Sequence, residues 1–279
     1  MDTHEITETF SHISVDVQTS NIIFALSDDG RCRVECYEDQ NAKHSVTVQN
    51  NTLVIKSSSK PWYKYIGFNF VTPKLTIYLP ENVYGSLFID NSTGTIDISQ
   101  NLTFESAELS TSTGKITFAN AVVSDLIQIK AITGHIYLEN LSAGSIDTSC
   151  STGKTTMTNV DCTKNITLST STGSTHLTDI TCRNLATTGN TGKISLKNVI
   201  ASENFSIQRN TGNVEFEGCD AAQIFIKTNT GDITGTLLSG KIFAFPESTL
   251  GKVDVPKTYT GGLCEIISNT GNIKISLEK

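Results

Sequence analysis

Residues 190–196 read Asn-Thr-Gly-Lys-Ile-Ser-Leu, and residues 210–216 read Asn-Thr-Gly-Asn-Val-Glu-Phe. The shared pattern is a short polar residue, then Thr-Gly, then two apolar residues that alternate with polar ones. Its glycine recurs at steps of 19 or 20 residues along the chain. The glycines of the pattern are Gly94, Gly114, Gly134, Gly153, Gly173, Gly192, Gly212, Gly231, Gly251 and Gly271. A step of this length is typical of repeat proteins in which each unit stacks on its neighbours.

Within each repeat, apolar and polar residues alternate, which is the period of a β-strand. One apolar pair follows the glycine, as Ile194 and Leu196 do, and a second pair precedes the next glycine, as Phe205 and Ile207 do. Two short strands cannot bury their own apolar face, but stacked repeats bury it in a continuous core. We therefore predict an all-β fold, a single-chain parallel β-solenoid of about ten coils of 19–20 residues. The crossover rule favours right-handed winding.

Residues 1–88 precede the regular step and contain strand-like runs without it, such as residues 21–26 and 33–37. Because the first coil of a solenoid must hide an open end, we predict that residues 1–88 form a strand-rich N-terminal cap. The solenoid repeats of residues 89–279 continue directly from it. No capping element follows the last coil, which predicts an open C-terminal edge that is either paired in a homodimer or only weakly protected.

The composition excludes some classes of protein. The 279 residues carry a formal net charge of −7, and only 18% of them are charged. An acidic chain of this kind is not a nucleic-acid binder by bulk electrostatics. No apolar run is long enough for a spanning helix, and the first residues do not resemble a signal peptide.

A search for catalytic or metal-binding groups finds few candidates. Glu215 and Asp254 occupy the same position of their repeats, two coils and roughly 10 Å apart. This separation is at the upper end of the distances found between the two carboxylates of a glycosidase. The five histidines do not cluster. We predict no enzymatic activity, no catalytic residue, no metal site and no cofactor.

Two further sets of side chains have both a structural and a functional interpretation. Each set forms a column, because its members occupy the same position in several repeats. Cys162 and Cys182 stack on adjacent coils, where a disulfide is feasible, but small apolar residues share their position, which favours reduced core thiols. Lysines directly follow several corner glycines, at Lys115, Lys154, Lys193 and Lys252. They could bind an acidic polymer, although a solvated corner that resists edge pairing is the simpler interpretation.

Aromatic residues concentrate in residues 60–70, which hold the only tryptophan. Side chains of this kind beside lysines suit sugar stacking or a partner hot spot. The candidate ligand-binding residues are therefore Trp62, Tyr63, Tyr65 and Phe68. The alternative is that the segment closes the N-terminal end of the core.

Residues 61–63, Pro-Trp-Tyr, and the strand-like residues 73–80 precede the Ser/Asn-Thr-Gly-x-Ile-x-Ile coils. From about residue 10 onward, the chain resembles a bacterial family of unknown function whose members are labelled "putative adhesins". This family is similar to the head domains of "putative autotransporter adhesins". The resemblance implies a Thr-Gly repeat β-solenoid and an extracytoplasmic location in the cell envelope. Family members often carry a membrane anchor, so we expect this location if the protein carries such an anchor, for which this sequence shows no candidate segment.

A long repeat without a catalytic pocket suits binding better than chemistry. We therefore predict a non-catalytic cell-envelope adhesion or scaffold module. Its expected partners are a cell-wall or surface glycan, or another envelope protein, and no nucleic acid. The alternatives are a polysaccharide-processing enzyme on a β-helix and a purely structural or oligomerising element.

Overall fold

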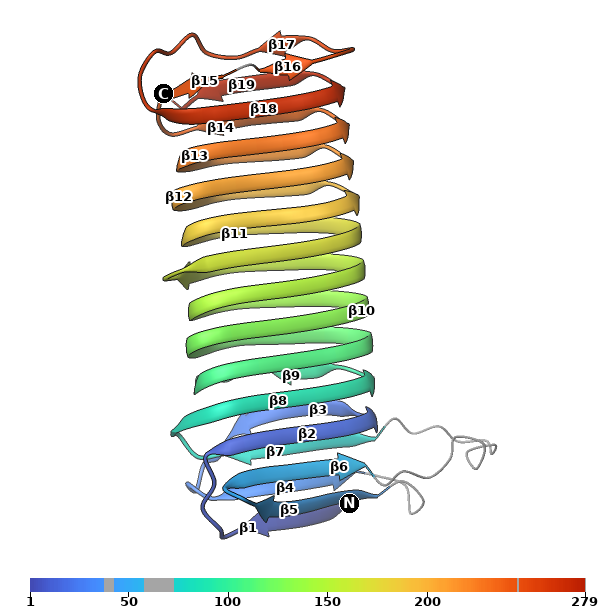
Figure 1. Ribbon diagram of the computed structural model, residues 1–279. Helices are drawn as coiled ribbons and strands as arrows, with labels where there is room; N and C mark the ends of the chain where they lie inside the picture. Colours follow the sequence, from blue (N-terminus) through green and yellow to red (C-terminus); the bar gives the residue numbers. More distant parts are fainter. Residues whose placement is uncertain (38–42, 58–72, 245, 279) are drawn as a thin grey trace, which may run out of the picture. The chain divides into compact units, whose positions relative to one another are not determined.

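The computed structural model describes residues 1–37, 43–57, 73–244 and 246–278 (Figure 1). The regular secondary structure of these residues is entirely β, which confirms the prediction of an all-β fold. The described residues include no helix that is long and apolar enough to cross a membrane. The strands are β1 (Asp2–Ile6), β2 (His12–Thr19), β3 (Asn21–Leu26), β4 (Cys32–Tyr37), β5 (His44–Gln49), β6 (Thr52–Ser57), β7 (Lys74–Leu79), β8 (Val83–Thr93), β9 (Ile96–Ile98), β10 (Leu102–Cys162), β11 (Asn165–Thr191), β12 (Ile194–Thr211), β13 (Val214–Thr230), β14 (Ile233–Leu237), β15 (Lys241–Phe243), β16 (Glu247–Ser248), β17 (Val253–Asp254), β18 (Gly262–Thr270) and β19 (Ile273–Leu277).

The chain divides into two compact units, Met1–Tyr137 and Leu138–Lys279. In the second unit, successive coils pair in parallel and in register. Thr152 pairs with Thr172, and Thr191 pairs with Thr211, so partners are 20 residues apart. Thr211 pairs in turn with Thr230, 19 residues further on. These are the steps of the sequence repeat, and the parallel pairing is that of a β-solenoid-like fold.

Side chains alternate between the core and solvent along much of the long coil strands, as the period of the sequence predicts. In β12, for example, Ile194 and Leu196 are buried, whereas Lys197 is exposed. Each fully buried aliphatic or aromatic side chain contributes about 1.5–3 kcal/mol to folding. Val253 is an exception among the predicted core positions, because it is 40% exposed on the short outer strand β17.

Glycine is required at the Thr-Gly corners for two reasons. Gly192 and Gly212 have φ angles of 134° and 143°, which side chains of L-residues rarely adopt. In addition, a Cβ atom on Gly192 would collide with the carbonyl oxygen of Gly173 in the neighbouring coil. The corner column therefore brings the backbones of successive coils closer together than any side chain permits.

A second corner, which was not predicted from the sequence, contains residues in the left-handed αL conformation. Asn140, Asn159 and Asn198 each have a φ of 52°, and Asp179 has a φ of 55°. Asn and Asp are the non-glycine residues that best tolerate this conformation. The Nδ2 group of Asn159 donates to Oδ1 of Asn140 at 2.8 Å, so the column also forms a ladder between coils. The signal in the sequence is an Asn or Asp six residues after five consecutive corner glycines, from Gly114 to Gly192.

The C-terminal coil does not lie at the end of the stack of coils. β18 pairs with β13 along one edge and with β15 and β16 along the other. β19 likewise pairs with β14 and with β17. The expectation that no capping element protects this coil is therefore wrong, because residues 238–261, which precede it in sequence, supply its outer partners. The predicted homodimer stays a prediction, and its edge would now be formed by β15–β17.

The first unit repeats this arrangement near the N-terminus. β2 pairs in parallel with β8 and β6, and β3 pairs in parallel with β9 and β7. The coil β2–β3 thus lies between two segments that follow it in sequence. Antiparallel pairing joins β4 to β1 and β7, and β5 to β6. Ser20 takes the place of the corner glycine, and its amide donates to the carbonyl of Thr93 at 3.1 Å. The domain boundary at residue 88 stays a prediction.

Candidate ligand-binding groove

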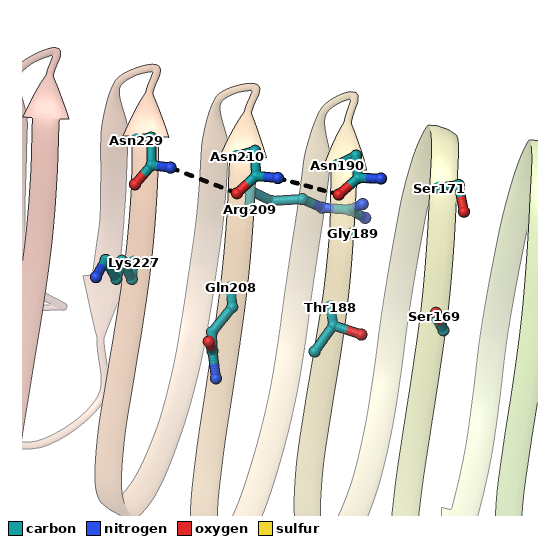
Figure 2. Close-up of a pocket in the computed structure, with 10 residues that line it drawn as sticks. All are labelled: Ser169, Ser171, Thr188, Gly189, Asn190, Gln208, Arg209, Asn210, Lys227 and Asn229. Atoms are coloured by element: carbon teal, nitrogen blue, oxygen red, sulfur yellow. Dashed lines mark hydrogen bonds between the residues drawn. The ribbon is translucent and has the colours of Figure 1, made fainter.

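A groove of about 420 Å³ lies on the outer face of β11, β12 and β13, within the second unit (Figure 2). Two rows of outward-facing side chains line it, and the backbone between the rows forms its floor. Because neighbouring strands are in register, each row places chemically similar groups about 4.8 Å apart, the spacing of paired strands. The lining residues are Ser169, Ser171, Thr188, Gly189, Asn190, Gln208, Arg209, Asn210, Lys227 and Asn229.

The first row, called the corner row here, consists of Ser171, Asn190, Asn210 and Asn229, each two residues before a corner glycine. The side-chain amides hold one another in place. Nδ2 of Asn210 donates to Oδ1 of Asn190 at 3.0 Å, and Nδ2 of Asn229 donates to Oδ1 of Asn210 at 3.4 Å (Figure 2). An amide has two donor hydrogens and two acceptor lone pairs, so each retains capacity for a ligand.

The second row consists of Ser169, Thr188, Gln208 and Lys227, two residues earlier in each coil. Thr188 pairs with Gln208, and Gln208 pairs with Lys227, across neighbouring strands. None of the ten lining residues is acidic, although the chain as a whole has a net charge of −7. Lys227 forms no ion pair with any described carboxylate. The groove therefore combines amides and hydroxyls with a lysine on one wall.

Arg209 lies between the two rows, but its side chain points into the protein, where only 3% of the residue is exposed. Its guanidinium lies against Gly189, where a Cβ atom would collide with Nη1 (Figure 2). Nη1 donates to the carbonyl of Thr170 at 2.9 Å, and Nη2 donates to Oγ1 of Thr175 at 3.0 Å. Gly189 therefore makes room for a long cationic side chain beneath the floor of the groove.

The charge of Arg209 has no counterion among the described residues. No described carboxylate forms an ion pair with it, and its Nε atom has no hydrogen-bond partner. Burial lowers the pKa of this guanidinium from its usual value, but arginine remains protonated in proteins. A positive charge thus lies in a low-dielectric environment without local neutralisation.

A second groove of about 390 Å³ crosses the opposite half of the same coils, and its charges are balanced. His176, Glu215 and Lys197 are among the residues that line it. Nζ of Lys193 lies 2.6 Å from Oε2 of Glu215, and Nζ of Lys197 lies 3.6 Å from Oε1 of Glu217. Burial, followed by the charges of Lys154 and Lys193, lowers the pKa of His176. These exposed ion pairs occupy the charged groups, so this groove offers fewer free charges to a ligand.

A family model described as "Toastrack DUF4097" matches residues 10–164 and, in a second match, residues 161–279. The chain belongs to the Toastrack DUF4097 family. This finding confirms the resemblance to a family of unknown function. A comparison with curated proteins finds no match.

Solved structures also resemble the Toastrack chain. A "putative lipid binding protein" from Parabacteroides distasonis ATCC 8503 is 16% identical, with a TM-score of 0.51, over 84% of this chain and 96% of that chain. A "putative adhesin" from Bacteroides fragilis NCTC 9343 is 14% identical, with a TM-score of 0.47, over 99% of this chain and 96% of that chain. A "putative cell adhesion protein" from Clostridium sporogenes ATCC 15579 is 10% identical, with a TM-score of 0.22, over 99% of both chains. The P. distasonis structure supports the assignment of the fold.

The structure does not describe the residues that the sequence predicted to bind a ligand. Trp62, Tyr63, Tyr65 and Phe68 lie outside the described residues of this Toastrack chain, so their role stays a prediction. Two members of the predicted lysine column have partners. Lys193 forms an ion pair with Glu215, and Nζ of Lys115 lies 4.5 Å from the ring centroid of Tyr137.

The proposed acidic pair is further apart than the sequence indicated. Glu215 pairs with Thr234, Thr234 with Lys274, and Lys274 with Asp254. The two carboxylates are thus three coil steps apart, on the order of 14 Å, with a lysine between them. The estimate of two coils was wrong because it assumed that coils stack in sequence order. This separation exceeds the range of a glycosidase pair.

All seven cysteines lie in the described part of the chain, and all are buried and free of disulfides. Cys162 and Cys182 are 2% and 7% exposed.

Among the described residues, no group of three or more His, Cys, Asp and Glu side chains is arranged to hold a metal ion. Arg209 and Gly189 were not predicted from the sequence, because a single arginine at a core position gives no periodic signal and its pairing with Gly189 depends on the register.

Proposed function

We propose that this Toastrack protein is a non-catalytic binding module of the cell envelope, acting in adhesion or as a scaffold. Its frame is a right-handed parallel β-solenoid of about ten coils. The observation that carries this proposal is the groove on β11–β13, where outward amides and hydroxyls repeat from coil to coil. Repeated weak contacts of this kind bind multivalent surfaces well, because each additional contact forms at a high effective concentration. A cell-wall or surface glycan, or another envelope protein, would be the partner.

Fractionation of the native, full-length protein in its host, combined with protease treatment of intact cells, tests this proposal. We expect the protein in the envelope fraction and its cleavage by external protease. The purified chain should also bind isolated cell envelopes without consuming or cleaving them. A cytosolic protein that does not bind envelopes would overturn the proposal.

A second candidate function is self-association through the C-terminal cap, defined here as residues 238–263. Among the described residues of this cap, exposed apolar side chains are Leu238, Ile242, Leu250, Val253, Tyr259 and Leu263. The short strands β15–β17 also pair along only one edge among the described residues. Light scattering over a range of protein concentrations tests this candidate. A dimer that dissociates in the Leu250→Ser/Tyr259→Ser variant would support it, and a monomer at all concentrations would exclude it.

A further inference from the structure

We propose that the groove on β11–β13 binds an acidic linear glycan, a polysaccharide that carries carboxylate or sulfate groups. This inference rests on the proposed binding function and names its ligand class. The groove supplies two cationic groups and no acidic one, on a chain whose net charge is −7. Local positive potential on an acidic protein attracts anions to this place.

The two cations act from different sides of the groove. Lys227 stands on the wall beside Gln208 and Asn229, where its ammonium can contact an anion directly (Figure 2). The guanidinium of Arg209 lies beneath the floor at Gly189 and is almost fully buried. Because the interior has a low dielectric constant and no described carboxylate neutralises this charge, its field extends through the backbone into the groove. An anion above Gly189 would supply the missing counterion.

The polar rows fit a polymer better than an isolated ion. The corner row and the second row together offer one pair of side chains on each coil, about 4.8 Å from the next pair. A linear glycan presents hydroxyl groups at each successive sugar, and amides and hydroxyls can both donate to and accept from them. The same side chains, Asn190, Asn210 and Gln208, are held in register by pairing across β11 and β12. Their order reduces the entropic cost of binding.

The lining also explains why an acidic glycan is favoured over a neutral one. None of the ten lining residues is aromatic, so the groove lacks the stacking surface that neutral sugars use. Hydrogen bonds to water compete with those to a neutral sugar, which leaves little net gain. Charge therefore decides between the two kinds of glycan.

Binding of the purified chain to immobilised polygalacturonate, dextran sulfate and neutral dextran tests the inference. We expect binding to one or both acidic polymers, weakened by increasing salt, and at least about ten-fold weaker binding to neutral dextran. The carboxylated and sulfated arms identify which anion the groove prefers. Lys227→Gln should weaken binding about five-fold or more, and Lys227→Glu should weaken it further. Lys197→Gln, which removes the same charge outside the groove, is the matched control and should change affinity less than two-fold.

Arg209 needs variants that separate its charge from its structural contacts. Arg209→Met removes the buried charge and should weaken binding and its salt dependence, while leaving the unfolding midpoint equal or higher. Arg209→Lys keeps the charge, so this variant should bind more tightly than Arg209→Met even if its stability is lower than that of the wild type. Any of three results would overturn the inference. The first is equal binding of all three polymers, the second is a Lys227→Glu variant that binds the acidic polymers as tightly as the wild type, and the third is no binding to either acidic polymer. If isolated envelopes still bind in that case, the proposed adhesion function stands and only the ligand class fails.

Discussion

The amide of Gly231 donates to the carbonyl of Thr270 at 2.9 Å, which places the C-terminal Thr-Gly corner directly on the corner of β13. Gly251 falls between these two residues in sequence, yet a Cβ atom on it would meet the carbonyl oxygen of Gly271. The spatial order of these corners is therefore Gly231, Gly271, Gly251. The C-terminal coil, β18–β19, therefore lies between β13–β14 and the strands β15–β17, which precede it in sequence.

This order predicts how amide exchange varies among the last strands. β18 pairs along both edges, whereas β15 and β16 pair only with β18 among the described residues. We expect amides of residues 262–270 to exchange about ten-fold or more slowly than those of residues 241–248, because only the latter open without disrupting the stack. Hydrogen exchange measured by mass spectrometry on the monomer tests this. Equal rates in the two segments would contradict the inserted position of β18.

A buried ion pair links the C-terminal cap to β13, and its loss should destabilise the second unit. Nζ of Lys241 lies 2.6 Å from Oδ1 of Asp220, and the lysine side chain is only 4% exposed. Lys241→Met leaves the Asp220 carboxylate without its partner, so we expect a loss of about 3 kcal/mol in urea unfolding. The double variant Asp220→Asn/Lys241→Met is the control and should recover much of this loss.

The contribution of this ion pair should also depend on pH. Burial raises the pKa of Asp220, but hydrogen bonds from Lys241 and Ser239 and the charge of Lys241 outweigh burial, so the net pKa lies below the usual 3.8. A lowered folded-state pKa stabilises the fold above the unfolded value, and this contribution disappears as the pH falls through the folded value. The stability difference between the wild type and Lys241→Met should therefore be constant near neutrality and shrink below about pH 4. A difference that grows on acidification would refute this assignment.

The corner glycines should be far more sensitive to substitution than an isolated turn glycine. Gly192→Ala forces a side chain into a φ of 134° and against the carbonyl of Gly173. We expect a loss of about 3–5 kcal/mol, because backbone strain and overpacking add. Gly30→Ala is the matched control, since Gly30 also has a positive φ, 72°, but a Cβ atom added there would have no atom within 4 Å. That variant should lose only about 1 kcal/mol in thermal or urea unfolding. Equal losses would show that crowding between coils is unimportant.

The repeat was readable from the sequence because each coil contributes a local signal. The corner glycine and the alternating apolar residues recur at a constant step, and their burial, as at Ile194 and Val214, follows directly. The insertion of β18–β19 was not readable, because which coil a strand pairs with is a long-range choice that the pattern leaves open. The same applies to the place of β2–β3 between β8–β9 and β6–β7. Stacking in sequence order was the wrong assumption behind the predicted open C-terminal edge and behind the estimated spacing of Glu215 and Asp254.

The candidate groove was only partly predictable. Asn190, Asn210 and Asn229 belong to the repeated pattern as its short polar residue, but the pattern alone does not indicate that they line a groove. Arg209 carries the positive charge of the floor, and its single occurrence at a core position gave no periodic signal. The core can accommodate Arg209 only because Gly189, one coil away, has no side chain, and this contact is evident only once the register is known.

The buried cysteines should make the protein less stable at alkaline pH. Desolvation raises the pKa of Cys182 to about 12, with a smaller contribution from Cys162, and desolvation raises that of Cys264 to about 12 as well, against a usual value of 9.0. Above pH 9 the unfolded chain loses thiol protons that the folded chain retains. This ionisation lowers the free energy of the unfolded state, so stability falls until the folded thiols ionise as well. We expect the free energy of unfolding in urea to decrease between pH 8 and pH 10, by about 1.4 kcal/mol per pH unit for each such thiol above its unfolded pKa.

Cys182→Ala isolates the contribution of one thiol, and alanine already occupies the equivalent position at Ala201. This variant should show a shallower fall in stability above pH 9 than the wild type, while its stability at pH 7 changes mainly through lost packing. Other groups that ionise at high pH, such as Tyr84, are common to both proteins and cancel in the comparison. Alkylation provides an independent measurement, because a buried thiol with a pKa near 12 reacts only when the structure opens. Parallel pH curves for the two proteins, or labelling of Cys182 at pH 8 as fast as free cysteine, would show that this thiol is not protected as the structure requires.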